Sequence, residues 1–132
     1  MNNSLISEVA SKLQDWGFGT LATDLFIGSL PETVATGCFM VSAPSPEPHK
    51  YLDTEDQVID FWYRSDHTDL AYSKMRDLYN LLHRRANWNT LSYHIYFSNA
   101  LGSIRDADRD IEGGKMLVLS VQFKCRNINN VS

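Results

Sequence analysis

The sequence predicts an α+β domain with two layers, in which a mainly antiparallel sheet of about five strands carries two helices on one face. Two stretches repeat apolar residues at helical spacing, and five shorter ones are apolar or alternate apolar with polar residues. Their order is helix, three strands, helix and two strands, with hairpin connections dominant and both helices in need of a sheet face to cover. With 132 residues and 43% hydrophobic content, the chain is expected to form a single domain over residues 1–132.

The first part of the chain is expected to hold one helix and two strands. The helix has Asn3 or Ser4 as its N-cap and Gly17 just beyond its end. Its apolar stripe consists of Leu5, Ile6, Val9, Ala10 and Leu13. A short apolar run that closes with a turn signal predicts a strand over residues 24–27, and residues 37–43, apolar on both faces, predict a central strand.

The stretch from Asp56 to Arg85 organises the rest, because it predicts a strand followed directly by a long amphipathic helix. Period-two spacing places Ile59, Phe61 and Tyr63 on a buried face, and it places Val58, Asp60, Trp62 and Arg64 on a mixed one. Ser65 or Asp66 is the expected N-cap, and the helix is expected to end near Arg85. Its apolar stripe consists of Ala71, Met75, Leu78 and Leu82.

Two further strands are expected after this helix. Residues 85–90 are interpreted as a turn, and the alternating residues 92–98 as a strand. A long polar hairpin connection over residues 99–114 leads to the clearest strand of the chain, residues 115–125. The polar tail, residues 127–132, is expected to be disordered.

Charge and cysteine content exclude several classes of protein. A net charge of −4 argues against a protein that coats nucleic acid, because phosphate binding needs clustered Lys and Arg. Cys38 and Cys125 both lie in predicted strands, which indicates two buried thiols in a reducing compartment rather than a disulfide framework. No segment reads as a secretion signal or a membrane span, so no membrane partner is expected.

No motif in the chain predicts catalysis, a cofactor or a metal site. Acids alternate at Asp106, Asp108, Asp110 and Glu112. A calcium loop counted from Asp106 would need Gly at its sixth position and Glu at its twelfth, where the chain has Ile111 and Leu117. The four histidines have no metal-ligand spacing, and no Gly-rich phosphate loop is present. A small metal-dependent hydrolase or nuclease that uses the acids from Asp106 to Glu112 remains the alternative from another class.

The mixed sheet face and two long connections are instead candidates for an interface. A helix-free face carrying Trp62, Tyr96, Met116 and Val118 would be a poor surface to leave in water, which favours self-association. The proline-rich loop over residues 42–56 is about fifteen residues long, and loops of this length often carry binding. The candidate subunit or partner interface comprises Pro46, Pro48, His49, Asp60, Trp62, Arg64, Tyr96, Arg105, Asp106, Asp108, Arg109, Asp110 and Glu112.

The order of these elements resembles the small tail terminator and minor capsid proteins of the neck of long-tailed bacteriophages. The resemblance depends on the strand-to-helix passage from Arg64 to Leu82 and on the loop from Asp110 to Gly113 that precedes the last strand. It implies a virion subunit, assembled in the host cytoplasm, that forms a hexameric ring on the finished tail tube. Such a ring would contact the major tail tube protein and the head connector or head-completion protein, and DNA would pass through its channel without specific binding. Head–tail joining is the alternative within the same particle.

Overall fold

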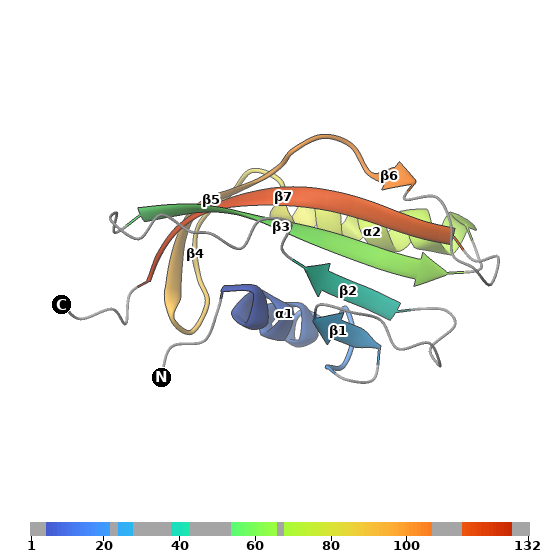
Figure 1. The fold of residues 1–132 in the computed structure, drawn as a ribbon, viewed down its shortest axis with the longest axis horizontal. Coiled ribbons are helices and arrows are strands. Elements are labelled where there is room, and N and C mark those ends of the chain that lie inside the picture. The colour runs from blue at the N-terminus through green and yellow to red at the C-terminus, as the bar shows by residue number, and fades with distance from the viewer. Residues whose placement is uncertain are drawn as a thin grey trace.

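The computed structural model describes residues 5–21, 24–27, 38–42, 54–65, 68–106 and 115–127. Two helices and a mostly antiparallel sheet of seven strands make up this part of the chain (Figure 1), which confirms the predicted α+β class. The elements are α1 (Leu5–Asp15), β1 (Leu25–Ile27), β2 (Cys38–Ser42), β3 (Thr54–Ser65), α2 (Thr68–Leu82), β4 (Arg85–Asn89), β5 (Tyr93–Ala100), β6 (Arg105–Asp106) and β7 (Lys115–Asn127).

The sheet is built around the pairing of β3 with β7. Its strand order is β1-β2-β3-β7-β5-β4, and β6 pairs with β7 on the same side as β5. β3 and β7 are antiparallel over the whole of β3, from Thr54 opposite Arg126 to Ser65 opposite Lys115. Only the pairing of β1 with β2 is parallel among the described strands. Two long central strands therefore fix which side chains share each face of the sheet.

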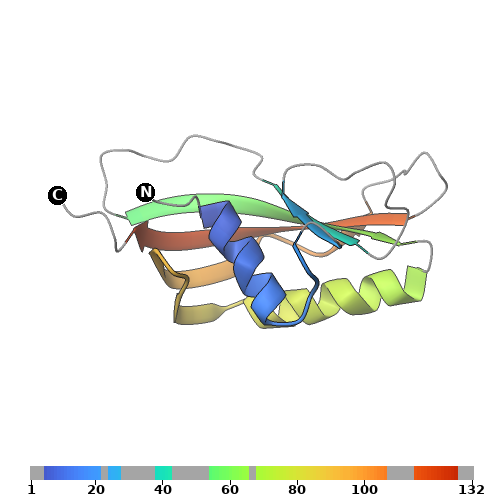
Figure 2. The ribbon, with the colours of Figure 1, turned by 90° about the horizontal axis from the view of Figure 1, so that it is seen from below.

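Both helices lie on the same side of β3 and β7, as the sequence predicts (Figure 2). α1 packs against β1 and β2, and α2 packs against β3, β7 and β5. Their apolar stripes meet the inward residues of the sheet in one hydrophobic cluster, where Phe61 and Phe123 are fully buried with ring centroids 6.3 Å apart. Truncating side chains of this size in a packed core typically costs about 3–5 kcal/mol.

At the C-terminal ends of both helices, backbone carbonyls accept hydrogen bonds from beyond the helix. Gly17 has a φ of 88° and follows α1, while the amide of Phe18 donates to the carbonyl of Leu13 over 2.9 Å, the pattern of a Schellman motif. At the end of α2 the hydroxyl of Ser98 donates to the carbonyl of Leu82 over 2.7 Å. The left-handed φ of 58° at Arg84 then turns the chain into β4.

α2 ends earlier than the sequence predicts, and Ser65 is not its N-cap. Thr68 is its first residue, while Ser65, one of the two predicted caps, is the buried last residue of β3. The other predicted cap, Asp66, lies outside the described residues. α2 ends at Leu82 rather than near Arg85, because the left-handed backbone at Arg84 cannot continue a helix.

The sheet has more strands than the sequence predicts. Residues 85–89, predicted as a turn, form β4 on the edge beside β5. The positive φ of 55° at Asn87 interrupts the alternation of inward and outward side chains by which a strand is recognised in the sequence. β6 lies within the predicted polar connection. β7 continues to Asn127, so the first residue of the predicted tail belongs to a strand, and residues 128–132 lie outside the described residues. No helix in the described ranges has the length and apolar character needed to span a membrane.

Candidate subunit interface

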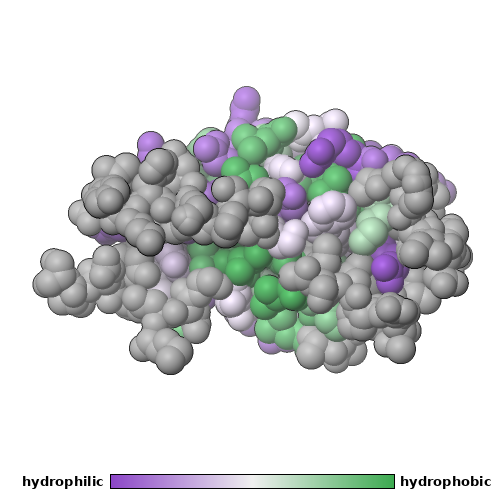
Figure 3. Space-filling view, viewed as in Figure 1, coloured by the Kyte–Doolittle hydropathy of each residue, from purple (hydrophilic) through white to green (hydrophobic). Residues whose placement is uncertain are grey.

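The face of the sheet opposite the helices is called the outer face here. It carries Ser42 of β2, then Asp60, Trp62 and Arg64 of β3, and Met116, Val118 and Ser120 of β7. Neither described helix covers it, which follows from the packing of both helices on the other side. Figure 3 views the molecule from this side and shows hydrophobic and hydrophilic residues intermixed. The predicted mixed face of the third strand is therefore real.

A chain of hydrogen bonds crosses the middle of the outer face. The guanidinium of Arg105 donates from Nη2 to the hydroxyl of Ser120 over 2.9 Å, and that hydroxyl donates to Oδ1 of Asp60 over 2.6 Å. Asp60 and Ser120 are directly opposite on β3 and β7, which is why two short polar side chains meet. The serine thus links a cation and an anion that the sequence separates by 45 residues (60 to 105).

The apolar residues of the outer face lie in the next row. Val118 is opposite Trp62 on β3 and opposite Arg105 on β6, and it is only 4% exposed. Trp62 is half-buried, and its indole Nε1 donates to the hydroxyl of Ser42 over 2.9 Å. Met116 is also half-buried. The apolar surface offered to water is consequently smaller than the sequence suggests.

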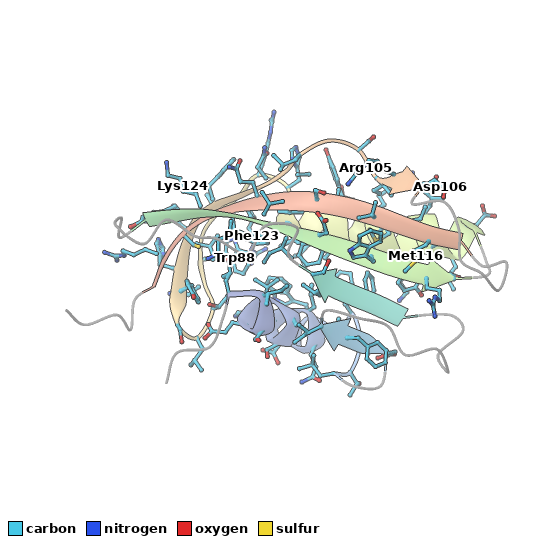
Figure 4. All side chains as sticks on the ribbon, viewed as in Figure 1. Trp88, Arg105, Asp106, Met116, Phe123 and Lys124 are labelled. Atoms are coloured by element: carbon cyan, nitrogen blue, oxygen red, sulfur yellow. The ribbon has the colours of Figure 1, made fainter. Side chains whose placement is uncertain are left out.

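Tyr96 does not belong to this row, although the sequence places it on the same patch. It occupies a β-bulge of β5, where the register with β7 shifts between Ile95 and Phe97. Phe97 pairs with Lys124, six residues along β7 from Val118, which corresponds to roughly 20 Å along a strand. Figure 4 shows Lys124 and Met116 toward opposite ends of β7. Tyr96 packs edge-to-face against the imidazole of His94, with ring centroids 4.8 Å apart.

The two long connections are only partly described. Arg105 and Asp106 form β6, and both are exposed beside β7 (Figure 4). The other candidate residues of these connections lie outside the described ranges: Pro46, Pro48, His49, Asp108, Arg109, Asp110 and Glu112. Within the described ranges no group of three His, Cys, Asp or Glu side chains is placed to hold a metal ion.

Ser42 and Ser120 are the parts of the outer face that sequence reasoning missed. Neither serine belongs to a sequence motif, and single serines occur on many strands without any special role. The useful signal is the register: once β3 is paired with β7, alternation places Ser120 beside Asp60. The role of Arg105 also needed the structure, since the sequence assigns it to a loop.

The described residues form a small α+β domain in which helices pack on one sheet face and the other face carries both polar and apolar side chains. The comparison with protein families gives the particular family: residues 12–127 match the model described as bacteriophage tail terminator protein. The chain belongs to the bacteriophage tail terminator family, and it is therefore a structural component of a phage tail. Comparison with curated proteins gave no significant match.

Proposed function

We propose that the protein forms a ring, of six copies by its resemblance to neck proteins, that caps the finished tail tube. The ring would stop further addition of the major tail tube protein and present a surface to the head connector or head-completion protein. The observation that carries the proposal is the tail terminator match over most of the chain. A closed ring needs a heterologous contact, in which one patch of a subunit meets a different patch of its neighbour.

The outer face is the surface that we assign to one side of this contact. Its support is physical: the described helices pack on the other face, and Asp60, Trp62 and Arg105 each form a hydrogen bond with a serine of this face. Held side chains lose little conformational entropy on association. Arg64, Tyr96, Asp106 and the candidate residues of the two long connections are proposed to extend the contact.

The proposed site of action is the tail neck of the virion, after assembly in the host cytoplasm. DNA would pass through the channel of the ring without specific binding. The net charge of −4 supports this proposal, because like charge suppresses contacts with phosphate.

The decisive experiment is negative-stain microscopy of lysates from a phage that lacks the gene, with the gene supplied in trans as control. Tail termination predicts overlong tubes without heads, and complementation should restore tails of normal length. Full heads beside tails of normal length would instead assign the protein to head–tail joining. Unaltered particles would contradict a role in the virion altogether.

A second experiment tests β6, where Arg105 shares the outer face with Val118 and Asp106 is opposite the inward Leu117. Arg105→Glu and Asp106→Lys each reverse one exposed charge on β6, while Asp77→Lys reverses an exposed charge on α2 as a matched control. The two β6 variants should complement the deletion poorly although circular dichroism shows a folded protein, and the control should complement fully. Normal particles from both β6 variants would remove this strand from the interface.

A further inference from the structure

Glu8 is a buried acid whose side chain joins α1 to the turn between β4 and β5. It is only 4% exposed, and its Oε1 accepts two hydrogen bonds, from the hydroxyl of Thr90 over 2.7 Å and from the amide of Ser92 over 2.6 Å. Its second oxygen, Oε2, is buried and receives no hydrogen bond within the described part of the chain. A buried carboxylate oxygen without a donor is costly, so this atom indicates a missing partner.

Glu8 also lines a hollow between α1 and this turn. The hollow has a volume of about 480 Å³ and is lined by Glu8, Ser11, Lys12, Asp15, Asn89, Thr90 and Leu91. Leu91 is 78% exposed, and it lies next to Ser92, whose backbone amide donates to Glu8. Leu91 therefore offers an exposed apolar side chain at the edge of the hollow.

The charge of the hollow favours a cation. Among the described residues that line it, Glu8 and Asp15 carry carboxylates and Lys12 carries an ammonium. That ammonium is 5.9 Å from the ring centroid of Trp16, so it already has an aromatic partner. Acids therefore outnumber cations among the described lining residues, and the buried Oε2 of Glu8 lacks a donor within the described part of the chain.

We infer that this hollow binds an ammonium or guanidinium group carried on an aliphatic stem. The cationic head would donate to the carboxylate of Glu8, and the stem would lie against Leu91. A basic side chain of a second copy of the chain and a free alkyl amine share this chemistry. The outer face plays no part in this site, because the hollow is formed by α1 and the turn beyond β4.

Agmatine, which has a guanidinium and an ammonium on a butyl stem, is the probe for the test. We expect a titration of the ¹⁵N-labelled 15.0 kDa protein to give saturable amide shifts at Ser11, Asn89 and Leu91. Glu8→Gln keeps an oxygen acceptor for Thr90 and Ser92 but removes the charge, so it should weaken binding roughly tenfold or more. Leu91→Ser should also weaken it, whereas Asp77→Asn on α2 should not.

The outcomes distinguish whether the hollow binds a cation from whether that cation belongs to a second copy of the chain or to a free amine. Absence of saturable shifts in the wild-type protein, or equal affinity in Glu8→Gln and wild type, would overturn the site. Sedimentation velocity then identifies the source: a basic side chain of a second copy predicts self-association that agmatine and Glu8→Gln both weaken. Self-association unaffected by either would assign the hollow to free amines. Agmatine binding is measured without a phage, so its failure would leave the ring proposal untouched.

Discussion

Replacing Glu8 with Ala should destabilise the protein strongly, because it removes the acceptor shared by two buried donors. Thr90 and Ser92 are 5% and 4% exposed, so neither donor regains water easily. Leaving one buried donor unsatisfied costs about 1–3 kcal/mol. Two unsatisfied donors would therefore lower the free energy of unfolding by about 2–6 kcal/mol. This loss is reduced because a buried charge no longer has to be desolvated and because water can enter from the adjacent hollow. We expect a net loss of about 2–4 kcal/mol for Glu8→Ala, and about 1 kcal/mol for Glu8→Gln, which keeps an acceptor.

Urea unfolding followed by tryptophan fluorescence measures these losses directly. Trp16 follows α1, and Trp88 lies on β4, with ring centroids 5.5 Å apart, so the emission reports on this junction. The slope of the unfolding free energy against urea should stay unchanged, since the buried area hardly differs. A Glu8→Ala protein within about 0.5 kcal/mol of wild type, the range of ordinary surface changes, would refute the argument that this carboxylate holds the turn.

Three further changes test other contacts. Arg85→Lys should lower the free energy of unfolding by about 1 kcal/mol. The guanidinium lies 5.1 Å and 5.5 Å from the ring centroids of Trp16 and Trp88, and an ammonium cannot stack on these rings. An unchanged thermal midpoint would contradict this. Leu78→Ala, at a fully buried position, should cost about 2–5 kcal/mol in chemical unfolding, and a smaller loss would mean that α2 is loosely packed. Trp62→Phe should cost about 1 kcal/mol by deleting the bond to Ser42, and the double variant with Ser42→Ala should then add little.

The predictable part of the fold is the part in which periodicity and burial agree. The stripe of α2 is an example, since Ala71, Met75, Leu78 and Leu82 are all fully buried as the spacing predicts. The alternation of Ile59, Phe61 and Tyr63 likewise identifies the inward face of β3. Both patterns reflect contact with one core, and that contact leaves a regular signal in the sequence.

The sequence did not predict β4, because the contacts that hold this strand come from residues distant in sequence and leave no local pattern. Of its five residues only Trp88 is buried, and the left-handed backbone at Asn87 breaks the alternation. The strand is held by pairing with β5 and by the contacts of Trp88 with Trp16 and Phe123, which are distant in sequence. Such long-range contacts override local propensity.

The candidate interface was predictable in composition but not in arrangement. Asp60, Trp62 and Arg105 were all named from the sequence, yet their hydrogen bonds to Ser42 and Ser120 depend on the register of four strands, β2, β3, β6 and β7. Tyr96 was grouped with Trp62 because simple alternation places it outward, but β5 pairs with residues 121–127 of β7, far from Val118, and a bulge further disturbs its alternation. A single extra residue in a strand is invisible to period-two reasoning.

The outer face also bears on how a subunit of the proposed ring would avoid association with the wrong partner. Its most apolar member, Val118, is 4% exposed between Trp62 and Arg105, and both of these donate hydrogen bonds to serines of the same face. A non-specific hydrophobic partner would bury little additional apolar area there. It would also remove water from the Asp60 carboxylate and the Arg105 guanidinium without offering them new hydrogen bonds, so these charges would keep only their contacts through Ser120. A partner that supplies matching polar groups escapes this penalty. In the proposed ring, specificity would therefore come from the hydrogen-bonded row, and the half-buried Trp62 and Met116 would supply the smaller apolar contribution.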